Sequence, residues 1–170
     1  APVAEDGGIT VGEDAAATSL GLSVPTTPDT GEVLSITVDV VPSVGEGIIQ
    51  INGMGTAVAA AATLTPTQLS QLMFTPAANY SGSVTDFTYT LSDGTGSDDD
   101  TGTVTIGINP VDDAPVAADG AITVAEDALA TSLGLSVPTT PDTGETLAIT
   151  VDGVPSAVQG IILINGTGTA

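Results

Sequence analysis

The amino-acid sequence predicts an all-β protein built from Greek-key β-sandwich repeats in tandem, and three observations support this prediction. Apolar residues, mostly Val, Ile and Leu, alternate with Thr and Ser along several short segments, which is typical of strands with one buried face. About seven such segments, separated by turn residues, precede residue 113, as expected for a two-sheet sandwich. The third observation is an internal repeat whose length suits one sandwich core.

The repeat begins again at Ala114, at a constant offset of 114 − 1 = 113 residues from Ala1. Positions 1–57 align with positions 114–170 without insertion; 12 positions differ and 57 − 12 = 45 are identical. We therefore expect a complete repeat over residues 1–113 and the first half of a second, near-identical repeat over residues 114–170. The second copy has no counterpart of residues 58–113 in this sequence. Either the chain is a window of a longer array, or a neighbouring chain supplies the missing strands.

Four strands are expected in the first half of the repeat. Residues 9–11 form a short first strand, and residues 20–24 alternate strictly until a proline stops pairing. Residues 34–40 alternate between apolar and polar side chains, so one side of this strand faces a core, with Val40 among the inward residues. A turn at residues 28–31 precedes this third strand, and an Asn-Gly turn follows a fourth strand, Gly47–Ile51.

The second half is expected to contain one helical turn and three strands. Thr65 followed by Pro66 is a favourable helix start, and the sequence predicts a short helix over residues 66–71. A strand at residues 73–75 follows it. Residues 87–91 and 104–108 alternate clearly and form the best hairpin, joined by an acidic loop over residues 93–101. The alanine-rich residues 58–64 fit no single assignment.

The charge balance excludes several classes of function. The chain has 21 Asp and Glu residues and no Lys, Arg, His or Cys, so neither side-chain salt bridges nor disulfides can form. Nucleic acids and anionic membrane surfaces call for basic patches, and no apolar run is long enough for membrane insertion. Catalysis would depend on carboxylates alone. Their recurrence in both copies favours a structural role, so we do not expect an enzyme.

The acidic residues are expected to gather at the joint between repeats. Strands in an antiparallel sandwich run alternately up and down, so alternate loops share one end. Clustered carboxylates without basic partners match the oxygen shell of Ca²⁺, whereas zinc and copper sites need His or Cys. The sequence therefore predicts a calcium site at the joint, with the candidate ligands Glu13, Asp14, Asp86, Asp112, Asp113, Asp119 and Asp142.

The run FTPAANYSGSVTDFTYTLSDGTG, followed by TGTVTIGINPVDDAP, resembles the cadherin-like tandem repeats of large bacterial surface proteins, including RTX-type repetitive adhesins. In animal cadherins a linker ending in Asp-Asn-Ala-Pro binds calcium between domains. The resemblance implies linker ligands at Asp112 and Asp113, a glutamate at Glu13, and an acidic loop of the next domain at Asp142. No acidic pair matches the mid-domain acidic motif of animal cadherins, and the resemblance leaves Asp86 as its substitute. The sequence departs from the pattern where Asn109 and Val111 occupy ligand positions.

Together these observations predict an extracellular, calcium-stiffened extender module of a repetitive bacterial adhesin or surface fibre. Its partners would be neighbouring repeats of the same protein. The alternative is a self-assembling extracellular filament subunit, a homopolymer in which strands from one chain complete the half repeat of the next. A carbohydrate-binding module is a third hypothesis, which the scarcity of aromatic side chains disfavours.

Overall fold

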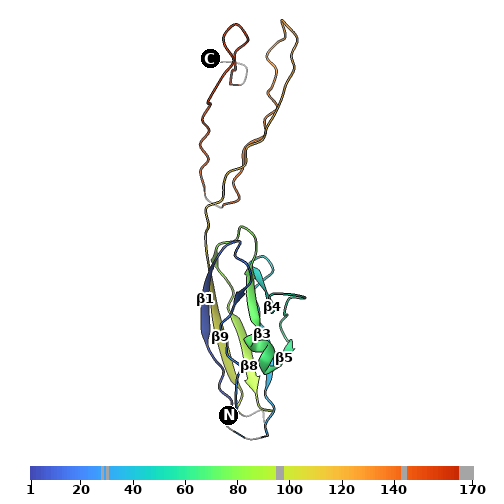
Figure 1. Cartoon of the computed structure of the whole chain (residues 1–170), viewed down its shortest axis with the longest axis vertical. Helices are drawn as coiled ribbons and strands as arrows, with labels where there is room; N and C mark the ends of the chain where they lie inside the picture. The colour runs from blue at the N-terminus through green and yellow to red at the C-terminus, as the bar shows by residue number, and fades with distance from the viewer. Residues whose placement is uncertain (28, 30, 95–97, 143–144, 165–170) are drawn as a thin grey trace. The chain divides into compact units, whose positions relative to one another are not determined.

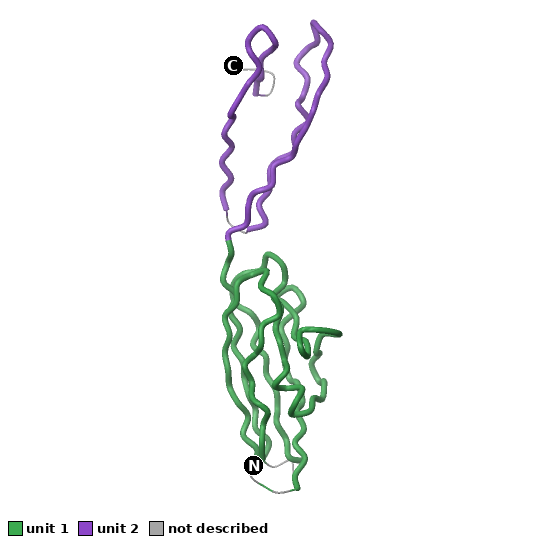
Figure 2. The backbone as a smooth tube through the Cα atoms, in the orientation of Figure 1, with its two compact units in different colours: residues 1–111 green, residues 112–170 purple. Residues whose placement is uncertain are grey.

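The computed structural model describes residues 1–27, 29, 31–94, 98–142 and 145–164. The chain divides into two compact units, Ala1–Val111 and Asp112–Ala170 (Figure 2). Among the described residues, every strand and the helix belong to the first unit (Figure 1). No helix in the described ranges has the length and apolar character needed to cross a membrane.

The first unit is a sandwich of two sheets, as predicted (Figure 1). One sheet contains, in spatial order, β1 (Gly7–Gly12), β9 (Asp100–Asn109), β8 (Phe87–Ser92), β3 (Ser35–Val40) and β5 (Thr63–Leu64), with β7 (Gly82–Ser83) also paired to β9. The other sheet contains β2 (Thr18–Ser19), β6 (Leu72–Pro76) and β4 (Gly47–Ile51). The helix α1 (Pro66–Ser70) connects the two sheets and packs beside β3 and β5.

The core follows directly from the alternation of the sequence. In β8 and β9 every second side chain is buried, and the intervening threonines face outward. Phe87 and Tyr89 lie two residues apart on the inner face of β8, with ring centroids 5.9 Å apart. The other large buried side chains are aliphatic apart from Phe74, which explains how a chain with few aromatic residues fills one sandwich.

Most of the predicted elements are confirmed, including the hairpin of β8 and β9 and the strand β4 with the bounds expected for it. The helix is one residue shorter than predicted. It begins with a capping box, in which the Thr65 side chain accepts from the Gln68 N–H and the Gln68 side chain accepts from the Thr65 N–H. The predicted turn at residues 28–31 and the predicted acidic loop at residues 93–101 lie partly outside the described residues.

Two strand predictions were wrong in detail. The second strand is Thr18–Ser19 rather than residues 20–24, because Gly21 has a φ of 78° and breaks the extended run. Leu20 and Leu22 are nevertheless buried, whereas Val24 is exposed. Val40 was expected to face the core but is exposed, because the pairing of β3 with β8 shifts register after Val38.

The two halves of the first unit are interleaved strand by strand. Every named strand of residues 1–57 pairs with a strand of residues 58–109: β1 with β9, β2 with β6, β3 with β5 and β8, and β4 with β6. No two strands of the first half pair with each other among the described residues. A first half alone therefore cannot build either sheet. The second unit agrees with this conclusion, since its described residues contain isolated bridges but no ladder.

Candidate metal centre

The second unit brings the linker and a loop of the second repeat together. Val116 and Thr139 exchange two backbone hydrogen bonds, of 2.8 and 3.2 Å, in an isolated antiparallel bridge. The Asp113 N–H donates to Asp142 Oδ2 over 2.8 Å. These three bonds hold residues 113–116 of the linker beside residues 139–142.

Hydrogen bonds between residues that are close in sequence hold the segment around Asp142. Thr140 Oγ1 donates to Glu145 Oε2 over 2.6 Å and accepts from the Asp142 N–H over 3.2 Å. The first copy forms the same two bonds at the same distances, with Thr27 in the place of Thr140. A threonine hydroxyl that closes a turn two residues ahead is a common local motif. The same two hydrogen bonds therefore form in both units, although, in the part of the chain that the structure describes, sheets occur only in the first.

Three carboxylates meet at this loop. Asp112, Asp142 and Glu145 each offer an oxygen atom, and these atoms lie within 4.8 Å of one another. The second oxygen of Asp142, Oδ1, is buried and has no hydrogen-bond partner among the described residues. A buried carboxylate oxygen without a donor is costly, and the chain has no Lys, Arg or His side chain to supply one. The donor set is all oxygen, which fits a hard divalent cation such as Ca²⁺.

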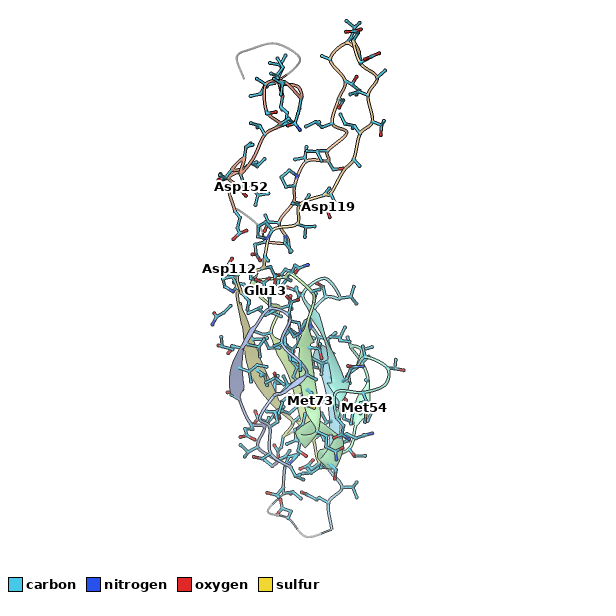
Figure 3. The ribbon with its side chains drawn as sticks, turned by 45° about the horizontal axis from the view of Figure 1, so that its top comes forward. Glu13, Met54, Met73, Asp112, Asp119 and Asp152 are labelled. Carbon is cyan, nitrogen blue, oxygen red and sulfur yellow. The ribbon has the colours of Figure 1, made fainter. Side chains whose placement is uncertain are left out.

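Glu13 and Asp14 follow β1 in the first unit, at the end of the sandwich where β9 also ends (Figure 3). Glu13 is buried; its N–H donates to the Asn109 carbonyl and its Oε1 accepts from the Val111 N–H over 2.7 Å. Asp14 has a φ of 60°, and its Oδ1 accepts from the Asn79 N–H over 3.2 Å. Both carboxylates thus already fasten the strand ends and loops of this unit.

The remaining predicted ligands are not drawn into the three-carboxylate cluster. Asp86 is exposed, one residue before β8. Asp119 is exposed in the second unit, and its counterpart in the first copy, Asp6, accepts from the Thr103 N–H of β9 over 2.8 Å. Asp113 takes part through its backbone N–H. Glu145 was missing from the predicted ligands, although its spacing three residues after Asp142 is identical in both copies and could have indicated it.

Glu46 binds two loops at the end of the first unit. Its Oε2 accepts from the Ser43 N–H over 2.7 Å, and its Oε1 accepts from the N–H and the hydroxyl of Thr85 over 3.0 and 3.1 Å. The hydrogen bond from the Ser43 backbone is the main cause that lowers the pKa of Glu46, with further help from Thr85. The second copy has Gln159 at this position, which still accepts from the Ser156 N–H.

Tyr89 fixes the start of the chain at the other end of the first unit. Its hydroxyl accepts from the Glu5 N–H over 3.0 Å and donates to the Glu5 carbonyl over 2.9 Å. Burial raises the pKa of Tyr89, and the nearby charges of Glu5, Asp6 and Asp100 raise it further. The ring packs closely against Gly102. A larger residue would not fit there, because its Cβ would lie 2.6 Å from the ring.

Comparison with known proteins identifies one family. A model of the cadherin-like domain matches residues 2–109, which is 109 − 2 + 1 = 108 of the 170 residues. No curated protein and no solved structure shows a significant match to the chain. The matched range covers all the strands of the sandwich and ends at the last residue of β9. An all-β domain of this type is non-enzymatic and typically extracellular.

Proposed function

The chain belongs to the cadherin-like domain family, and on that premise we propose that it is an extracellular, calcium-stiffened extender module of a repetitive bacterial adhesin or surface fibre. Domains of this family generally bind calcium, and the fold is that of a structural or adhesion module. The function is to hold successive repeats at a defined spacing, and the partners are the neighbouring repeats of the same protein.

The cluster of Asp112, Asp142 and Glu145 is the observation that carries this proposal. Asp112 comes from the linker, whereas the other two residues come from a loop of the repeat that follows it. A calcium ion held by all three carboxylates would tie the linker to that loop and would supply the missing partner of Asp142 Oδ1. Without the ion, the same carboxylates repel one another and the linker is free to swing.

We include the remaining predicted ligands in the same proposal, although the structural support differs from one residue to the next. Glu13, Asp14 and Asp86 would add ligands from the preceding repeat, and Asp113 would add to those of the linker. The bonds that Glu13 and Asp14 make within the first unit orient them independently of any ion. Asp119 has the weakest support, because its counterpart Asp6 binds the backbone of β9. Affinities of extracellular calcium modules are about 10⁻⁴ to 10⁻³ M, which suits a calcium-rich medium.

The alternative, a homopolymeric filament completed by strand complementation, has less support from the strand pairing. Residues 58–109 already pair with residues 1–57 of the same chain, and donating them to another copy would break those ladders.

A calcium titration followed by NMR tests the proposed site. In the isotope-labelled 170-residue chain, Ca²⁺ should shift the backbone amide signals of the non-proline residues in the ranges 112–116 and 139–142. The dissociation constant should be about 10⁻⁴ to 10⁻³ M. Asp142→Asn and Glu145→Gln should each weaken binding by at least about tenfold, because each removes a charged ligand. Mg²⁺ should bind much more weakly, since it needs a tighter octahedral site.

Asp152→Asn is the matched control, because it removes one carboxylate from the same unit outside the cluster. It should leave calcium binding unchanged. The proposal fails if the amides of the cluster do not respond to 10 mM Ca²⁺, taken as about ten times the weaker dissociation constant. It also fails if Asp152→Asn weakens binding as much as Asp142→Asn does, since charge alone would then account for the effect.

A further inference from the structure

The acidic residues of the first unit avoid one of its two sheets. Residues 15–28 and 47–85 contain no Asp or Glu, although these two ranges make up nearly half of the unit. All three strands of the smaller sheet, β2, β6 and β4, lie within them. The larger sheet differs, since it includes Asp39 of β3 and Asp100 of β9. The smaller sheet is therefore the uncharged side of the sandwich.

The outward side chains of the smaller sheet form a partly apolar surface. In β4 and β6 the inward residues are buried, whereas Ile48, Gln50, Met73 and Thr75 alternate with them and are half-exposed. Ile48 lies opposite Thr75, and Gln50 lies opposite Met73. Directly opposite residues on one face of an antiparallel pair are in contact. The four side chains are therefore neighbours on the outside of the sandwich.

The turn after β4 extends this surface. A Cβ added to Gly53 would lie 3.3 Å from Met73 Sδ, so the turn packs beside that side chain. Met54, the next residue, is 72% exposed, and both methionines of the chain therefore lie in this region (Figure 3). Methionine is enriched at the cores of protein interfaces, whereas Asp and Glu are depleted there. The uncharged face, as we call this surface, consists of five residues: Ile48, Gln50, Met54, Met73 and Thr75.

The charge of the chain limits what can cover the uncharged face. Because the chain has no Lys, Arg or His, no carboxylate of one copy can form a salt bridge with a side chain of another copy. Two copies can therefore meet without burying an unpaired carboxylate only through surfaces that carry none, and the uncharged face is such a surface. A basic partner would instead be drawn to the carboxylates elsewhere on the chain. The charge pattern thus favours a second copy as the occupant.

We infer that the uncharged face is a contact surface between two copies of this chain, in which the face of each copy covers the face of the other. Such an isologous contact uses the same residues on both sides of a twofold axis. The strands of the smaller sheet are short and offer little area, so the contact is weak. It joins chains side by side, whereas the proposed calcium site joins repeats along one chain, and neither depends on the other.

Analytical ultracentrifugation of the 170-residue chain tests the inference. The samples contain a chelator, so that calcium plays no part, and about 1 M NaCl, which shortens the Debye length to about 3 Å and weakens the repulsion between copies. With increasing protein concentration, the mass should rise from that of a monomer toward that of a dimer, with a dissociation constant below about 1 mM. A chain that is still monomeric at about 1 mM overturns the inference.

Thr75→Asp and Thr105→Asp form a matched pair, since each adds one carboxylate at an outward position of a strand, in β6 or in β9. Thr75→Asp should weaken the dimer at least about tenfold, because two unpaired carboxylates then enter the contact. Thr105→Asp adds the same charge to the larger sheet and should leave the dissociation constant nearly unchanged. Thr75→Val adds no charge and should not weaken the dimer. Equal weakening by both Asp variants overturns the inference, since net charge would then account for it.

NMR of the parent chain locates the contact without any variant. As the isotope-labelled chain is concentrated under the same conditions, the backbone amide signals of residues 47–51 and 72–75 should shift. The signals of residues 35–39 and 101–107, which belong to the larger sheet, should stay in place. Shifts confined to the larger sheet or to residues 114–164 would place the contact elsewhere and overturn the inference.

Discussion

The hydroxyl of Tyr89 makes two hydrogen bonds with the backbone of Glu5, and its removal should lower the stability of the first unit at neutral and alkaline pH. Its two hydrogen bonds with the backbone of Glu5 hold the entrance of the chain against β8. We predict that Tyr89→Phe lowers the free energy of unfolding of this unit by about 1 to 2 kcal/mol, since it leaves both backbone groups without this partner. Urea denaturation at pH 7 measures the difference.

The raised pKa of Tyr89 also predicts an alkaline dependence. Because the folded state holds the phenol proton more tightly than the unfolded state, this stabilisation is complete below about pH 10, the ordinary tyrosine value, and is lost as pH rises through the folded pKa. Stability of the parent chain should therefore fall as pH rises above about 10. Tyr89→Phe should flatten that fall; an unchanged slope would show that Tyr89 is not the group responsible.

Glu46 provides a second residue-scale prediction, with a replacement that the chain itself contains. Because its pKa is lowered on folding, Glu46 stabilises the loops above the ordinary glutamate pKa, about 4.5, and the effect is lost as pH falls through the folded value. Glu46→Gln, which copies Gln159, should cost less than about 1 kcal/mol at pH 7, because the group is partly exposed. The difference from the parent should shrink below about pH 4. A difference that stays constant with pH contradicts the assignment.

At the scale of the element, β9 is the strand on which the first sheet depends, because it pairs with β1, β7 and β8. Ile106→Asp should unfold the first unit with or without calcium, since it places an unpaired charge among apolar residues, at a cost of more than about 4 kcal/mol. Circular dichroism measures the loss of β-structure. Thr105→Asp, one residue earlier on the outer face, is the control and should cost less than about 1 kcal/mol. Retained folding of Ile106→Asp would show that the strand register is wrong.

Local patterns predicted the elements well, because the alternation of β3, β8 and β9 and the capping hydroxyl of α1 act within a few residues. The pairing of these elements was not predictable in the same way, since β1 meets β9 across most of the unit. The exposure of Val40 depends on a register shift that its own strand does not reveal. For the candidate site, Asp112 and Asp142 could be predicted from the seam between repeats. Glu145 was missed although its repeated spacing after Asp142 could have indicated it, because its closeness to Asp112 and Asp142 becomes visible only in the folded chain.

At the scale of the whole molecule, the two units should contribute very differently to thermal unfolding. The first unit holds the sheets and the core, whereas the second exposes most of its apolar residues. At about 0.7 kcal/mol per residue, calorimetry should give an unfolding enthalpy of about 80 kcal/mol near 60 °C, rather than about 120 for the full length. A chain in which the sequence of residues 58–113 is appended after Ala170 should recover the larger value. An enthalpy near 120 kcal/mol for the 170-residue chain would mean that the second unit packs a core of its own.

The parallel pair of β1 and β9 determines how the first unit bears tension. The chain enters β1 at its first residue and leaves β9 at its last, and the two strands run side by side from the Gly7 and Val104 pair to the Gly12 and Asn109 pair. A force that pulls the two ends apart draws these strands past each other along their common axis. Their hydrogen bonds are then loaded together, in shear, instead of opening one at a time. A tether made of such repeats would resist a steady pull with the strength of the whole ladder.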